Sequence, residues 1–318
     1  MPDAACKHGH LVTRALPLAA AASASAMMAV PATAAELVLT GAPGSSWVVD
    51  NGEESCQLSR TFGEGENQVR LVLTQWAPGK SFAVMLAGRP LARFHGTVEL
   101  GFAGAGTALA SRRADYERGT LSGGEDALIF STVFLARPLG KDGGVIAVTP
   151  EGTPDLASPY GGAAPMLPPG AITMADRIEL TKGRETLRLE PSQLDNALSV
   201  LDACSQSHLP EWGLDAAAHR TMTRAPQAPD FSRAARAIQQ SYPSAAIARG
   251  EQANLHVRVL VDETGAAGDC TAVAATRTNI TTTACRHLTR DIRFLPALDA
   301  AGNPMKSFHT VNILFRID

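Results

Sequence analysis

The 318-residue sequence has few aromatic side chains and little net charge. Phe, Trp and Tyr make up 5% of the chain, and 28 Lys and Arg nearly balance 31 Asp and Glu. A formal net charge of -3 provides no basic footprint, so we expect no nucleic-acid partner. The 45% of apolar residues still suffices for packed cores, and the length favours two domains.

Motifs of common enzyme and metal sites are also missing from the sequence. It contains no G-x-S-x-G, H-E-x-x-H or Walker pattern, its cysteine spacing matches no zinc pattern, and its histidines are scattered. The paired carboxylates Glu53-Glu54 and Asp262-Glu263 are typical of solvated turns. We therefore expect a binding protein and not an enzyme, with no cofactor and no metal. A deep pocket lined by carboxylates and Trp76 would favour an enzyme or ligand-binding protein instead.

The first 34 residues have the layout of a secretory signal peptide. Lys7 and Arg14 form a basic leader, residues 15–30 form an Ala-rich apolar run, and Ala32-Thr33-Ala34 resembles a cleavage site. The alternative is an uncleaved membrane anchor, which would require about 20 strongly apolar residues. We expect residues 1–34 to be removed and the chain to be exported.

Four cysteines remain after removal of that segment, and an even count in an exported chain favours disulfides over free thiols. Four cysteines allow three connectivities. We favour Cys56–Cys204 and Cys270–Cys285, because each pair then closes within one domain.

Residues 36–212 are expected to form a β-rich domain. Short alternating runs such as Val69–Leu73 and Phe82–Leu86 recur between Gly- and Pro-containing turn signals, which predicts a sandwich or a strongly curved sheet. One helix, about Ser192 to Ser205, should close this domain and present Cys204 beside its apolar face; Ser192 and Asp195 resemble a capping box. Residues 213–229 show little apolar periodicity and are interpreted as a linker.

Residues 230–318 predict a small α+β domain. A helix from Phe231 and a short helical turn from Pro243 to Gly250 precede an alternating strand at Leu255–Val261. A turn at Thr264-Gly265 leads to a returning strand opened by Cys270. A helix follows, with its apolar face marked by Ile280, Ala284 and Leu288. The domain ends with a strand about ten residues long, in which Val311, Ile313, Phe315 and Ile317 alternate.

This last module resembles the C-terminal domain of the TonB family of energy-transducing periplasmic proteins. The resemblance covers about residues 230–318 and includes Tyr242-Pro243, Val257-Arg258-Val259, Val261 to Gly265, Arg293-Phe294, Pro296-Ala297, Asp299, Gly302, Pro304 and Ile313 to Arg316. It implies helices on one face of a short antiparallel sheet. The expected cleaved signal and short linker differ from the layout of a membrane-anchored energy transducer. We would therefore expect energy transduction only if residues 15–34 stay in place as an inner-membrane anchor.

The resemblance also implies a partner. Such domains contact a short extended segment of TonB-dependent outer-membrane receptors by strand pairing, so we expect a periplasmic protein that binds a receptor or another envelope protein. A long last strand at a sheet edge leaves main-chain groups open for an added strand. The expected contact residues are Phe308, Thr310, Asn312, Leu314 and Arg316. The alternative is a homodimer formed through the same strand.

Overall fold

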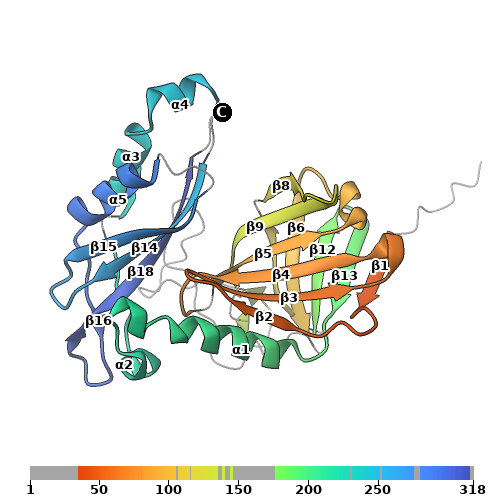
Figure 1. Ribbon diagram of the computed structural model, residues 1–318, viewed down its shortest axis with the longest axis horizontal. Helices are drawn as coiled ribbons and strands as arrows, with labels where there is room; N and C mark the ends of the chain where they lie inside the picture. The colour runs from red at the N-terminus through yellow and green to blue at the C-terminus, as the bar shows by residue number, and fades with distance from the viewer. Residues whose placement is uncertain are drawn as a thin grey trace, which may run out of the picture. The chain divides into compact units, whose positions relative to one another are not determined.

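A computed structural model describes residues 35–79, 81–104, 107–114, 116–134, 138–139, 144–145, 176–229, 231–250, 253–275 and 280–315 (Figure 1). The expected signal peptide, residues 1–34, lies outside this range.

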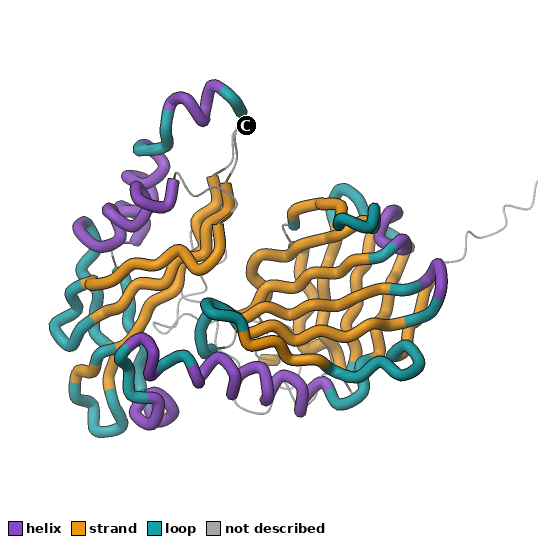
Figure 2. The backbone as a smooth tube through the Cα atoms, viewed as in Figure 1, coloured by secondary structure: helices purple, strands orange, loops and turns teal. Residues whose placement is uncertain are grey.

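The N-terminal part is a β-sandwich, as the alternating runs predicted. One sheet has the order β1 (Ala35–Thr40), β13 (Glu185–Glu190), β12 (Arg177–Lys182), β6 (Val98–Gly104) and β7 (Thr107–Ala114). The other has the order β2 (Val48–Asn51), β3 (Cys56–Phe62), β4 (Val69–Gln75), β5 (Ser81–Ala87), β9 (Asp126–Phe134) and β8 (Glu117–Thr120). A separate small pair joins β10 (Pro138–Leu139) to β11 (Gly144–Val145). Both large sheets contribute to a single core. Figure 2 shows one of the sheets lying in front of the other.

Helix α1 (Leu194–Ser207) packs on this core through its predicted apolar face: Leu194, Ala197, Leu198 and Leu201. The predicted capping box is wrong. Gln193 occupies the N-cap in the left-handed conformation with φ 59 and provides no side-chain cap. Ser192 instead accepts a hydrogen bond from Arg60 at 3.0 Å, which uses the hydroxyl that a capping box would need.

The segment predicted as a linker contains regular structure. Helix α2 (Ala216–Thr221) begins after Asp215, whose carboxylate accepts hydrogen bonds from the backbone N–H groups of Ala217 and Ala218 at 2.7 and 3.1 Å. Arg224 and Gln227 then form antiparallel bridges with Leu298 and Leu295. An N-cap and a run of good helix formers thus supply a helix in a segment without apolar periodicity.

The C-terminal part is α+β, as expected. Its sheet has the order β15 (Ala267–Ala275), β14 (Ala253–Val261) and β18 (Ser307–Phe315), all antiparallel. Helices α3 (Phe231–Gln240), α4 (Ser244–Ala248) and α5 (Thr281–Arg290) lie on one side of it (Figure 1). A hairpin of β16 (Ala297–Leu298) and β17 (Pro304–Met305) precedes β18. Leu255, Val257, Val259 and Val261 share a separate second core with Ile280, Ala284 and Leu288.

Both disulfides of the structure are the pairs predicted from the sequence. Cys56 at the start of β3 is bonded to Cys204 on α1, and Cys270 on β15 is bonded to Cys285 on α5. Each bond therefore ties a helix to a strand of its own domain.

Candidate functional site

Strand β18 forms one edge of the C-terminal sheet. Among the described residues it is paired with β14 alone, in an antiparallel register that runs unbroken from Ala253–Phe315 to Val261–Ser307. A strand with a single neighbour directs alternate backbone N–H and C=O groups away from its sheet. Nine consecutive residues with regular pairing make β18 a continuous template for a further strand.

The opposite edge, β15, is less suited to pairing. Its register with β14 shifts between His256 and Val257 and again between Val259 and Val261. Bulges twist an edge strand and interrupt the spacing of its main-chain groups, which natural sheets use to prevent unwanted pairing. The disulfide from Cys270 to α5 also holds this strand against the helical layer.

The predicted contact residues have different environments along β18. Thr310 is exposed, whereas Phe308 is half-buried and its ring meets Trp212 edge-to-face at 5.5 Å between centroids. Asn312 is half-buried. Leu314 lies on β18, but its side chain and all of Arg316 lie outside the described residues. The structure thus places four of the five positions on one edge strand.

Asp262, a residue of the TonB-like pattern, builds the turn between β14 and β15. Its Oδ1 accepts hydrogen bonds from Thr264 N, Thr264 Oγ1 and Ala266 N at 2.8, 2.7 and 2.9 Å. The Thr264 hydroxyl bond is the main cause that lowers the pKa of Asp262. These bonds assign Asp262 a turn-forming role.

Gly265 completes this turn at φ +79, and a Cβ there would lie 2.0 Å from the carbonyl oxygen of Phe294. Phe294 N in turn donates to Gly265 O at 3.0 Å. The glycine of the pattern is therefore needed both for its backbone conformation and for close approach of the segment that leads into β16.

The hairpin before β18 is held by a similar device. Asp299 Oδ1 accepts hydrogen bonds from the N–H groups of Ala301 and Asn303, both at 2.8 Å. The bond from Asn303 is the main cause that lowers the pKa of Asp299. Gly302 has φ +83 in the same turn. The loop thus sets where β18 begins.

His309 lies on β18 beside Phe294, at 5.2 Å between ring centroids. Burial lowers the pKa of His309 to about 4, against the opposing effect of a hydrogen bond with the Pro226 backbone. Its Nε2 is a buried nitrogen without a hydrogen-bond partner. A charged imidazole is therefore disfavoured at this point of the strand.

Side chains on the face of β14 away from the helices are enclosed. Arg258 is 6% exposed, its guanidinium lies 3.8 Å from the Trp212 ring centroid, and its Nη1 donates to Glu54 at 2.9 Å. His256 stacks on Trp76 at 3.9 Å, and burial lowers the pKa of His256 to about 4. An aromatic ring and a carboxylate thus cover Arg258 on this face of the sheet.

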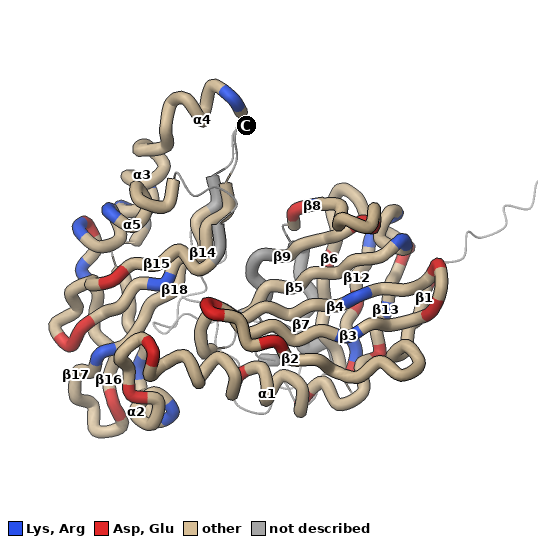
Figure 3. The backbone as a smooth tube through the Cα atoms, in the orientation of Figure 1, with Lys and Arg blue, Asp and Glu red and all other residues tan. Residues whose placement is uncertain are grey.

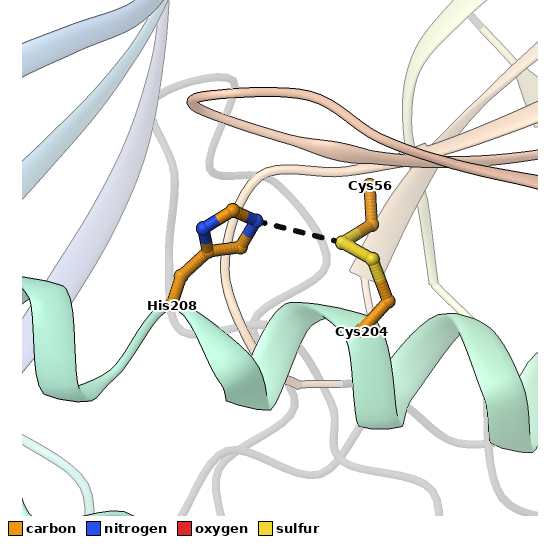
Figure 4. Close-up of side chains that lie close together, drawn as sticks. All are labelled: Cys56, Cys204 and His208. Atoms are coloured by element: carbon orange, nitrogen blue, oxygen red, sulfur yellow. Dashed lines mark hydrogen bonds between the residues drawn. A yellow bond between two sulfur atoms is a disulfide. The ribbon is translucent and has the colours of Figure 1, made fainter.

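Cys56, Cys204 and His208 form a cluster that was not recognised from the sequence (Figure 4). His208 Nε2 lies 3.6 Å from Cys56 Sγ, and the donor atoms of Cys56, Cys204 and His208 all lie within 4.8 Å of one another. Sequence reasoning treated His208 as one of several scattered histidines. The i, i+4 spacing of Cys204 and His208 at a helix end was the signal that could have found it.

No helix within the described residues is long and apolar enough to span a bilayer. Comparison with curated proteins and with solved structures found no significant match to the chain. Residues 238–317 match the family model described as the C-terminal domain of the TonB protein of Gram-negative bacteria. This range contains the three-stranded sheet, its two turns and α5, so residues 238–317 are a TonB C-terminal domain.

Proposed function

We propose that the chain binds an extended segment of an envelope protein by adding it as a fourth strand beside β18. The partner class that the TonB C-terminal domain implies is a TonB-dependent outer-membrane receptor. The observation that carries the proposal is the position of β18, an edge strand with nine regularly paired residues.

In this mode the main chain supplies affinity and the side chains supply selectivity. Thr310 is exposed and would contact the side chains of an added strand. Phe308 is half-buried and offers an aromatic surface near the start of β18. Lys and Arg are interspersed with Asp and Glu over the described elements (Figure 3). We therefore expect the affinity to change little with salt, because main-chain pairing does not depend on a charged patch.

The site of action in the proposal is the periplasm, where TonB-family proteins work. The two disulfides fit an oxidising compartment. In this proposal the chain acts by binding and not as an enzyme, and it uses no cofactor. Removal of residues 1–34 frees it from the membrane. An N-terminal sequence beginning near Ala35 in periplasmic extracts would support release. An intact Met1 in the membrane fraction would instead favour the alternative, a membrane-anchored energy transducer.

The direct test of strand addition modifies the peptide and leaves the protein intact. Receptor-derived peptides are N-methylated at one position at a time, which removes one N–H donor per peptide. Because alternate residues of an added strand point to β18, affinity should fall with a period of two along the peptide. Isothermal titration calorimetry measures it, and an affinity loss without this alternation would exclude strand addition.

A matched pair of protein variants tests which edge of the C-terminal sheet, β18 or β15, binds the peptide. Thr310 on β18 and Thr271 on β15 both pair with Arg258, from opposite sides of β14. Thr310→Pro should abolish peptide binding, whereas Thr271→Pro should retain it, provided that circular dichroism shows both variants folded. Equal binding by the two variants would place the partner elsewhere.

Self-pairing through β18 is the competing outcome. Sedimentation analysis of the full chain would then show a dimer that Thr310→Pro converts to a monomer and that receptor peptides fail to dissociate.

A further inference from the structure

We propose that the reduced Cys56–Cys204 pair, together with His208, forms a binding site for a thiophilic divalent metal ion such as Zn²⁺. The site lies in the N-terminal domain, where α1 ends against the start of β3, and is independent of the β18 edge. Disulfide and metal are then alternative cross-links between the same two elements.

One pair of donor atoms already has the spacing of a metal site, and the two bonded sulfurs would separate on reduction. Cys56 Sγ and His208 Nε2 are 3.6 Å apart, close to the separation of two ligands around a tetrahedral zinc ion. Cys204 and His208 are one helical turn apart, so both project to the same side of the end of α1. The Cα atoms of Cys56 and Cys204 are 6.1 Å apart, near enough for both thiolates to reach one ion.

The imidazole of His208 is oriented as a ligand. Its Nδ1 lies 3.2 Å from a carboxylate oxygen of Glu211, and since a carboxylate only accepts, Nδ1 carries the hydrogen. Nε2, the other ring nitrogen, faces Cys56 Sγ and is the atom placed to bind a metal ion (Figure 4). The side chain of His208 is only 6% exposed, so its orientation is fixed by its surroundings. A carboxylate behind the ring is the usual second partner of a metal-bound histidine.

The surroundings also favour a cation. His208 is the C-cap of α1, where the helix dipole places partial negative charge. Cys56 is fully buried, whereas Cys204 is half-buried and so partly accessible to solvent. Two thiolates and one imidazole are the donor set that zinc accepts, with a water molecule as the fourth ligand.

The exchange requires a dithiol reductant. One dithiol transfers two electrons and two protons to the Cys56–Cys204 bond and becomes a disulfide itself. The two thiols then lose their protons as the metal ion binds both sulfurs and His208 Nε2. The Cys270–Cys285 bond provides an internal comparison, since the Cys56–Cys204–His208 cluster is the metal-compatible group found among the described residues.

The test is a Co²⁺ titration of the full chain, reduced with a phosphine and kept anaerobic. We expect one Co²⁺ per chain, with sulfur-to-cobalt charge-transfer absorption and the visible bands of a tetrahedral ion. The spectrum should be lost in C56S/C204S and kept in C270S/C285S. His208→Ala should weaken binding about a hundredfold and Glu211→Gln about tenfold, whereas His95→Ala, an exposed histidine elsewhere, should bind like the wild type.

Alkylation provides a second measurement if the reduced chain loses structure. Zn²⁺ should then restore the near-ultraviolet circular dichroism and protect Cys56 and Cys204 from alkylation, as read by mass spectrometry of the digest. Protection that persists in His208→Ala, or a cobalt spectrum that C56S/C204S retains, would overturn the proposal. Absence of any charge-transfer band in the reduced wild type would overturn it equally.

Discussion

At the scale of single residues, the TonB-like pattern consists mainly of turn formers. Asp262 and Asp299 each bond several backbone N–H groups of their own turn, and Gly265 and Gly302 adopt positive φ. These turns fix the lengths and the ends of the strands on either side. The pattern therefore specifies the shape of the domain more than it specifies a partner.

Gly265 should be the glycine of this domain that is most sensitive to substitution. Gly265→Ala combines φ +79 with a Cβ placed 2.0 Å from Phe294 O, so we expect a loss of about 2–3 kcal/mol in the free energy of unfolding. The matched control is Gly250→Ala, where φ is +64 and nothing lies within 4 Å. It should lose about 1 kcal/mol. Urea unfolding of the two variants measures the difference, and equal losses would contradict the close approach.

His309 should make the C-terminal domain less stable in acid. Its pKa is lowered from 6.5 to about 4 in the folded chain, so below pH 6.5 the unfolded chain binds a proton that the folded imidazole does not. Stability should therefore be full above pH 6.5 and fall by about 2–3 kcal/mol as the pH drops to 4. His309→Gln should reduce this slope, whereas exposed His95→Gln should leave it unchanged. His256, with its own lowered pKa, keeps a second contribution in both variants.

At the scale of elements, alternation and helical spacing predicted the three helices and the three sheet strands of the C-terminal domain, but not the hairpin of β16 and β17. The errors have physical reasons. β15 begins at Ala267, before the predicted opening at Cys270, because backbone pairing with β14 extends the strand beyond its apolar residues. Helix α2 was missed because an N-cap and Ala-rich composition leave no apolar period to detect. Short-range signals thus gave element types better than element ends.

Helix α5 should anchor the sheet through one fully buried residue. Leu288 is 0% exposed within the second core, so Leu288→Ala should cost about 2–5 kcal/mol by leaving a cavity. Ile247→Ala on α4 is the matched control, since Ile247 is 51% exposed and should cost well under half as much. Thermal melts followed by circular dichroism compare them; similar midpoints would show that α5 is not held by this core.

At the scale of the whole molecule, two separate cores predict two unfolding transitions, each with its own disulfide. The Cys56–Cys204 bond spans 148 positions and the Cys270–Cys285 bond spans 15. Chain entropy assigns them about 5 and 3 kcal/mol.

We expect C56S/C204S to lower only the transition of the N-terminal domain, and C270S/C285S only that of the C-terminal domain. Differential scanning calorimetry resolves the two. A common shift of both transitions in either variant would show that the domains unfold together.

The sequence by itself determined the composition of both cores, the types of most elements, and which face of each strand is apolar, since a period of two specifies side-chain direction. It also favoured the two cysteine pairs, because each closes within one domain. Only the tertiary structure decided that the last strand pairs with β14, at the edge where it was expected, and that His208 meets a cysteine 152 positions earlier. Periodicity predicts which face of a strand is buried but not which strand it pairs with. Strand pairing depends on contacts between segments far apart in the chain.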